Sequence, residues 1–197
     1  MQKSLQLKEF MRSRRLVRFN RRFEEGTVRG YVLDVGPKFF LMALVSDQIW
    51  FDGFGCFRVS DVRQLRVDPY SRFAEEALKK RGEKKPGKPR VSVKTVQDLV
   101  LSAGRSFPLV TLHREEIDPD VCWIGRVLEV TPEIVTILEI CPDGSWESSP
   151  EKYRLSEITQ VDFGGNYEDA LYLVGGEPPT RAPRKWQYRP GKIRNEV

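Results

Sequence analysis

Three short segments of this chain occur twice, in the same order and at a nearly constant separation. The matches are LVRFNR (16–21) with LVTLHR (109–114), GYVLDVGP (30–37) with GRVLEVTP (125–132), and FRVSDVRQL (57–65) with YRLSEITQV (153–161). The paired segments are 93, 95 and 96 residues apart. Segments that recur at a fixed period are the sequence signature of a repeated structural unit. The chain is therefore predicted to contain two copies of one unit, related by duplication.

Each copy is predicted to begin with a helix and to continue with five short strands. The helices are expected over residues 4–14 and 95–104, the second with Thr95 as its cap and Asp98 three residues later. The strand segments are dense in β-branched and aromatic residues and are separated by Gly, Pro and Asp-Gly turns. They are expected at 16–23, 27–35, 39–45, 55–59 and 63–68 in the first copy, and at 107–113, 121–130, 134–140, 152–156 and 159–163 in the second.

A second short helix is predicted to close each copy, over residues 71–82 with Ser71 as its cap and over 166–176 with Asn166 as its cap. The segment between the copies has the composition of a linker. The predicted organisation is a first unit at 1–82, a basic linker at 83–92, a second unit at 93–176, and a basic tail rich in Pro and Arg at 177–197.

Five short strands in so small a unit leave exposed edges that must close or pair. A small, twisted, partly open barrel meets that requirement. Gly30 and Gly125 lie inside predicted strands, where a sharp bend or a bulge would account for a glycine. The predicted fold is therefore mainly β with flanking helices, arranged as two tandem five-stranded small barrels.

This order of a helix and five strands resembles the Sm-like fold of the Sm and Hfq ribonucleoproteins, and other SH3-like barrels share much of it. The motif residues are a glycine in the second strand and an arginine in the fourth: Gly30, Gly125, Arg58 and Arg154. The resemblance covers residues 4–68 and 94–163. It implies two Sm-like or SH3-like barrels whose edge strands associate.

In the Sm family an asparagine and an arginine help to hold an RNA base in the pore of the ring. This chain keeps the arginine in both copies, whereas Phe40 and Val135 stand at the asparagine positions and Pro37 and Pro132 replace the family's aspartate. The resemblance thus implies an RNA contact at the arginines alone.

Two interpretations of these arginines remain open. A guanidinium can bind an anion or stack on a base. Alternatively, each arginine pairs with an acid of the chain, and we favour this interpretation. Acids recur at matching positions of the two copies, namely Asp61 and Glu157 three residues after the arginines, and Asp34 and Glu129.

The net charge of +5 is unevenly distributed. Residues 1–30 hold nine Lys or Arg and three Glu, residues 79–94 hold eight and one, and residues 180–197 hold six and one, whereas the rest holds 10 basic and 23 acidic residues. Clustered basic residues suggest a polyanion such as RNA, although such charge also serves solubility. The candidate nucleic-acid or anion contacts, besides Arg58 and Arg154, are Arg12, Arg14, Arg15, Lys84, Lys85, Arg184, Lys185 and Trp186.

The sequence contains no recognisable catalytic or cofactor motif. His113 is the only histidine, and Cys56, Cys122 and Cys141 lack metal-ligand spacing. No enzymatic activity, cofactor or metal is therefore predicted. The N-terminal residues lack the apolar core of a signal peptide, and no apolar run approaches the about 20 residues that span a bilayer. An odd number of cysteines adds to the prediction of a cytoplasmic protein with free thiols and no membrane association.

The leading functional hypothesis is a non-enzymatic binding or scaffolding module that joins a protein partner or a second copy, as an oligomer, through strand edges. The second hypothesis is RNA binding through the basic N-terminal arm, linker and tail. A small hydrolase with an unrecognised carboxylate site ranks last.

Overall fold

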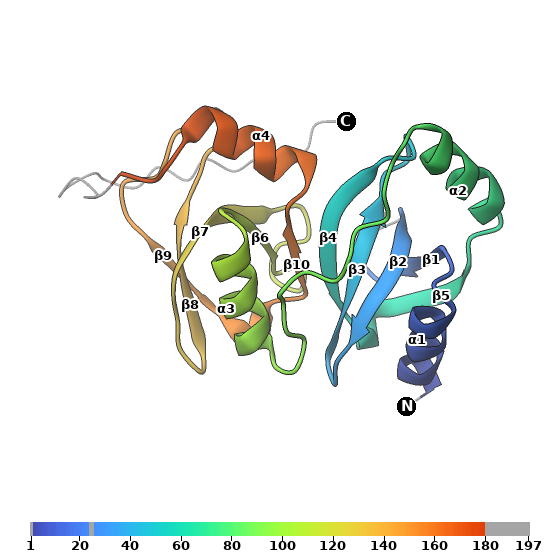
Figure 1. Cartoon of the computed structure of the whole chain (residues 1–197). Coiled ribbons are helices and arrows are strands. Elements are labelled where there is room, and N and C mark those ends of the chain that lie inside the picture. The colour runs from blue at the N-terminus through green and yellow to red at the C-terminus, as the bar shows by residue number, and fades with distance from the viewer. Residues whose placement is uncertain (1, 24–25, 180–197) are drawn as a thin grey trace.

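The structure is a computed structural model that describes residues 2–23 and 26–179. Its helices and strands follow the predicted order (Figure 1). The first half contains α1 (Gln2–Ser13), β1 (Val17–Arg21), β2 (Thr27–Val35), β3 (Phe39–Val45), β4 (Phe51–Arg58), β5 (Val62–Val67) and α2 (Ser71–Lys80). The second half contains α3 (Val96–Ser106), β6 (Val110–His113), β7 (Cys122–Val130), β8 (Ile134–Glu139), β9 (Glu151–Arg154), β10 (Gln160–Phe163) and α4 (Asn166–Gly175).

The ten strands form one antiparallel sheet in the order β5-β1-β2-β3-β4-β10-β6-β7-β8-β9. Within each half the fifth strand pairs with the first, so both halves have the same internal order. The prediction of a mainly β fold with flanking helices is confirmed. The sheet is nevertheless single and open, and the predicted pair of separate small barrels is not seen. The physical reason is that β4 pairs with β10, so the facing edges of the two halves satisfy each other's backbone groups (Figure 1).

The two glycines inside strands allow neighbouring backbones to approach closely. A Cβ at Gly30 would lie 2.2 Å from the carbonyl oxygen of Ala43, and a Cβ at Gly125 would lie 2.2 Å from that of Leu138. No side chain fits at either position. A bulge shifts the register of β2 with β3 and of β7 with β8 a few residues further on. The glycines and bulges give both halves the same strong bend.

The largest apolar core belongs to both halves. Phe39, Leu41 and Cys56 from β3 and β4 pack into it together with residues of the second half. Their neighbours in the same strands, Phe40 and Phe57, face a different core beneath α1. Successive side chains of a strand point to opposite faces, so β3 and β4 serve two cores at once. They are therefore shared walls, which is the second reason why two independent barrels do not form.

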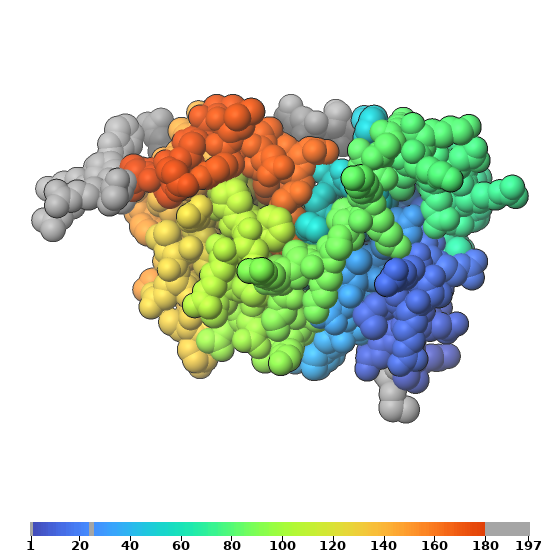
Figure 2. Space-filling model, viewed as in Figure 1, coloured from blue at the N-terminus to red at the C-terminus, as the bar shows by residue number. Residues whose placement is uncertain are grey.

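The end of the linker and the first residue of the second unit also belong to the shared core. Val91 and Val93 are 3% and 4% exposed. A Cβ at Gly36 would overlap the carbonyl oxygen of Val93, which shows how closely the chain passes the end of β2 just after the linker. Figure 2 shows this green segment lying across the boundary between the halves. Packing of the linker thus adds to strand pairing in holding the halves together.

The second helices cover corresponding parts of the outer face of the sheet. Ala74 of α2 packs near Tyr31 of β2, and Leu171 of α4 packs near Ile124 of β7. The predicted side-chain caps of these helices are not seen, since Ser71 and Asn166 are themselves the first helical residues. No helix in the described ranges is long and apolar enough to cross a membrane.

Candidate functional site

The junction of β4 with β10 joins the two halves of the molecule, and apolar contacts form its centre. Phe54 of β4 faces Phe163 of β10 in the strand register. Their ring centroids lie 5.8 Å apart, and Phe107 at the end of α3 lies 4.8 Å from Phe163. A buried aromatic ring contributes roughly 1.5–3 kcal/mol through the hydrophobic effect. Phe163 is buried and Phe54 and Phe107 are half-buried, so the aromatic cluster adds apolar burial to the strand pairing at the junction.

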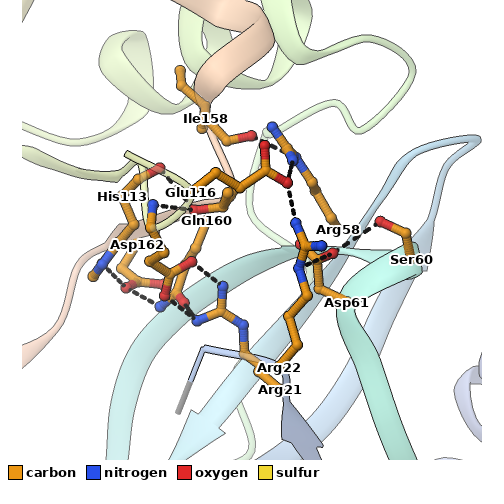
Figure 3. Close-up of polar contacts among 12 residues, drawn as sticks. Arg21, Arg22, Arg58, Ser60, Asp61, His113, Glu116, Ile158, Gln160 and Asp162 are labelled. Carbon is orange, nitrogen blue, oxygen red and sulfur yellow. Dashed lines mark hydrogen bonds and ion pairs between the residues drawn. The ribbon is translucent and has the colours of Figure 1, made fainter. Parts of the chain in front are cut away.

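Arg58, at the end of β4, reaches into the second half (Figure 3). Its Nε donates to the carbonyl oxygen of Ile158 at 2.7 Å, and its Nη2 donates to that of Ser156 at 2.8 Å. Its Nη1 lies 3.2 Å from the Glu116 carboxylate. The predicted partner Asp61 instead pairs with Arg22 at 3.3 Å. Asp34, the other acid expected near it, pairs with Lys88. Arg58 thus pairs with an acid of the chain, but with neither of the acids expected from the sequence, and its contacts join the two halves.

Arg154, the matching residue of the second half, has different surroundings. It ends β9, which is the outermost strand on its side of the sheet. Its side chain is exposed and makes no hydrogen bond or ion pair with the residues that the structure describes. The fold therefore places one copy of the motif arginine in an internal junction and the other at an open edge.

A buried charged pair lies beside Arg58 and was missed from the sequence. Arg21 of β1 and Glu115 after β6 have side chains 0% and 3% exposed, and the Arg21 Nη1 donates to Glu115 Oε1 at 2.7 Å. Arg21 also donates to Gln160 of β10. Arg21 ends the first repeated segment and matches Arg114, which pairs with Glu157 at 2.7 Å. That match was the available signal, but the distant partner of Arg21 was not predictable from it.

His113 extends this polar network across the sheet (Figure 3). Its Nε2 lies 2.9 Å from Asp162 Oδ2, and Gln160 donates to the same oxygen. Burial lowers the pKa of His113, but the hydrogen bond and the charge of Asp162 outweigh burial and raise it. Cys122 faces His113 across β6 and β7, and burial followed by the charge of Asp162 raises its pKa to about 11. The thiol therefore stays protonated at neutral pH and is a poor nucleophile.

Carboxylates of the second half do not assemble into a metal site. Burial raises the pKa of Glu168, and the nearby charges of Asp162 and Asp52 raise it further. Thr111 donates to Glu168, which satisfies one of its oxygens. Among residues 2–23 and 26–179, no group of three or more His, Cys, Asp or Glu side chains is arranged to hold a metal ion.

The basic residues proposed as anion contacts fall into three groups. Arg12, Arg14 and Arg15 are exposed at the end of α1 and just after it. Lys84 and Lys85 are exposed at the start of the linker, and the Lys85 Nζ donates to the Arg14 carbonyl oxygen at 3.0 Å. The arm and the linker are thus brought together. The tail candidates lie outside the described residues: Arg184, Lys185 and Trp186.

The two outer strand edges differ from the strands of the junction. β9 has only four residues, is preceded by Pro150, and exposes all of them except Tyr153. At the other edge, the carbonyl oxygens of Ser60 and Leu65 accept hydrogen bonds from α1 side chains. Short, charged strands are a common way to limit pairing at an edge.

No family model, curated protein or solved structure matches the chain. The resemblance to the Sm-like fold thus stays a prediction from the sequence. The functional argument rests on the geometry of the junction, the edges and the basic surfaces.

Proposed function

We propose that this protein is a non-enzymatic binding module, built from two duplicated Sm-like units, that joins protein chains through strand edges. The observation that carries the proposal is the β4–β10 junction. It joins two five-stranded units of identical strand order by edge pairing. The outer strands β5 and β9 are the corresponding edges on the two sides of the sheet, so the same mode of pairing is open to a further chain.

The arginine of the motif supports β9 as the docking edge. Arg58 holds the carbonyl oxygens of Ser156 and Ile158 across the junction. Arg154 has the matching place on β9, and a second copy offers the matching residues Ser60, just before its β5, and Val62, the first residue of its β5. Such pairing displaces the Lys3 side chain from the Ser60 carbonyl oxygen and the Gln6 side chain from the Leu65 carbonyl oxygen. Because β9 is short and starts after a proline, we expect weak, concentration-dependent association.

The test is the mass of the protein in solution across a micromolar-to-millimolar series, measured by light scattering and sedimentation velocity. We expect the average mass to rise with concentration. Arg154→Glu should weaken association, whereas Lys79→Glu, an exposed position on α2, should not. A monomer at every concentration, together with no captured protein whose binding depends on Arg154, would falsify the proposal.

RNA binding through the basic segments is the second candidate function. It is favoured by the contact between Lys85 and Arg14, which gathers the arm and the linker into one basic surface. Non-specific binding of this kind weakens steeply with salt. A mobility-shift series with mixed RNA and DNA tests it, and the absence of any shift at low salt removes it. A shift that survives Arg14→Gln/Arg15→Gln points to a different basic surface.

A further inference from the structure

The outer face of the first half carries a row of arginines across three strands. Arg66 of β5 faces Arg18 of β1, and Arg18 faces Arg29 of β2. Directly opposed residues on one face of an antiparallel sheet have Cβ atoms about 4.5–5.5 Å apart. On the next rung Arg63 faces Asn20. Four guanidinium groups therefore share one small area of the sheet.

A local distortion of β5 places two of these arginines on the same face. Arg63 and Arg66 are three residues apart, a spacing that puts side chains of a regular strand on opposite faces. Gln64 between them has the left-handed φ of 50°. The register accordingly shifts, so that three residues of β5 span two residues of β1, from Arg18 to Asn20. The bulge turns both arginines outward, and bulges often redirect a side chain for function.

The row is not explained by ion pairing within the described residues. Arg29 Nε lies 2.7 Å from the buried Asp68 carboxylate. Arg18, Arg63 and Arg66 pair with no acid that the structure describes, and the buried Nε of Arg18 has no hydrogen-bond partner there. Like charges directly opposite each other destabilise a sheet. The arrangement costs stability, so a ligand that uses the charge is the physical explanation for it.

The second half shows that the fold does not require these arginines. The corresponding row of β10, β6 and β7 is Asp162, Thr111 and Ile124. Ile124 is covered by α4, and Asp162 pairs with His113. The same scaffold positions thus carry an acid, a hydroxyl and an apolar side chain in one half, and only arginines in the other.

We propose that Arg18, Arg29, Arg63 and Arg66, which we call the arginine row, bind the phosphate backbone of a single-stranded nucleic acid. Guanidinium groups pair bidentately with phosphate. Aromatic rings that could stack on bases stand beside the row, since Tyr70 and Phe73 at the start of α2 are 65% and 64% exposed. The Asp68 carboxylate that holds Arg29 also accepts a hydrogen bond from the Tyr70 amide at 2.7 Å. Exposed rings favour a single strand, whose bases are free to stack.

This inference goes beyond the strand-edge function and does not depend on it. It also differs from binding through the arm, linker and tail, because the arginine row lies on the sheet itself. The mass of the protein in solution tests strand-edge assembly, whereas binding of labelled oligonucleotides tests the row. The failure of one therefore leaves the other standing.

The experiment measures the affinity of the full chain for fluorescein-labelled single-stranded RNA and DNA of mixed sequence by fluorescence anisotropy, over a series of salt concentrations. Arg63→Gln/Arg66→Gln should weaken binding about tenfold at low salt and reduce the slope of log affinity against log salt by about 1.4, as expected for two lost contacts. Phe73→Ala should weaken binding about fivefold without changing the slope. Thermal unfolding confirms that each variant is folded.

The matched control removes two charges from the second half, at the exposed Lys94 and Arg105. Lys94→Gln/Arg105→Gln should leave affinity and slope close to those of the wild type. Equal losses in both double variants overturn the proposal, as does unchanged binding by Arg63→Gln/Arg66→Gln or the absence of binding at low salt. Stronger binding of poly-glutamate, or of vesicles of anionic lipid, than of either oligonucleotide would also overturn the proposal, because the ligand of the arginine row would then not be a nucleic acid.

Discussion

The two halves share their strand order but differ in where charge is placed. In the first half arginines stand on the outer face of the sheet, while in the second half the matching positions are covered or paired with neighbouring groups. The motif arginines show the opposite distribution, because Arg58 is enclosed in the junction and Arg154 is exposed. Features that both halves share, such as Gly30 and Gly125, serve the fold. Features that only one half has are where function is to be sought.

The largest effect is expected from the buried pair of Arg21 and Glu115, which joins the two halves. The matching arginine of the second half, Arg114, pairs within its own half instead. Glu115→Gln leaves Arg21 without its buried carboxylate, and breaking a buried ion pair by removing one partner costs about 3–5 kcal/mol. Glu157→Gln removes the partner of Arg114, which is more exposed, and should cost less. Urea unfolding of both variants measures the difference. Equal costs would mean that the two pairs are energetically equivalent despite their different burial.

The motif arginines give the next largest contrast. Arg58→Met removes two charged hydrogen bonds to backbone carbonyl oxygens. Each contributes about 1.5–3 kcal/mol when buried, and because Arg58 is partly exposed we expect a total loss of about 3 kcal/mol. Arg154→Met changes an exposed residue and should stay within about 0.5 kcal/mol of the wild type. Chemical denaturation at low protein concentration measures both. A large loss for Arg154→Met under those conditions would place a contact at β9 within the single chain.

Substitution of His113 by its counterpart in the first half, Asn20, tests the polar network. The folded-state pKa of His113 is raised, so its stabilising effect is fully present below the unfolded value of about 6.5 and is lost as the pH rises through the higher folded value. The free energy of unfolding should therefore fall as the pH rises above about 6.5, by at most about 1.4 kcal/mol per pH unit for one proton.

His113→Asn should abolish this dependence, and the difference between the two pH profiles isolates it from the other titrating groups. Unfolding by urea at several pH values from about 5.5 to about 8.5, which spans the titration of histidine, provides the measurement. Parallel profiles would show that His113 has the same protonation behaviour in the folded and unfolded chains.

Local signals in the sequence predicted most of the elements. Thr95 caps α3 by accepting a hydrogen bond from the Asp98 amide at 3.0 Å, as expected, because the cap involves only neighbouring residues. Asp52 and Gly53 form one of the Asp-Gly pairs that the sequence predicts to be turns between strands, but they lie inside β4. Gly53 has a left-handed φ of 65°, and a Cβ there would collide with the backbone of Gly165. A glycine is thus needed at position 53 because the backbone of the second half approaches closely, and not because the chain turns there.

The features that could not be predicted from the sequence depend mostly on contacts between residues far apart in the chain. The repeated segments predicted two similar units but not that β4 of one would pair with β10 of the other. The cap of α4 is likewise distant, since Asp52 Oδ1 accepts the Asn166 amide hydrogen bond at 2.8 Å. The arginine row was missed for a different reason: the left-handed Gln64 that aligns Arg63 with Arg66 has no sequence signal of the kind that glycine gives.

The smallest expected effect has the sign opposite to that of most substitutions. Arg66→Gln removes one of two arginines that face each other across β5 and β1, and relief of that repulsion should stabilise the protein by about 0.2–1 kcal/mol. Arg63→Gln is the matched control within the same strand, because Arg63 faces the neutral Asn20 and should change stability less. Thermal unfolding at low and high salt measures both, and the gain should shrink at high salt as the charges are screened. If Arg66→Gln instead destabilises the protein, then Arg66 has a stabilising partner in the free chain, and the argument that the arginine row is kept at a cost in stability fails.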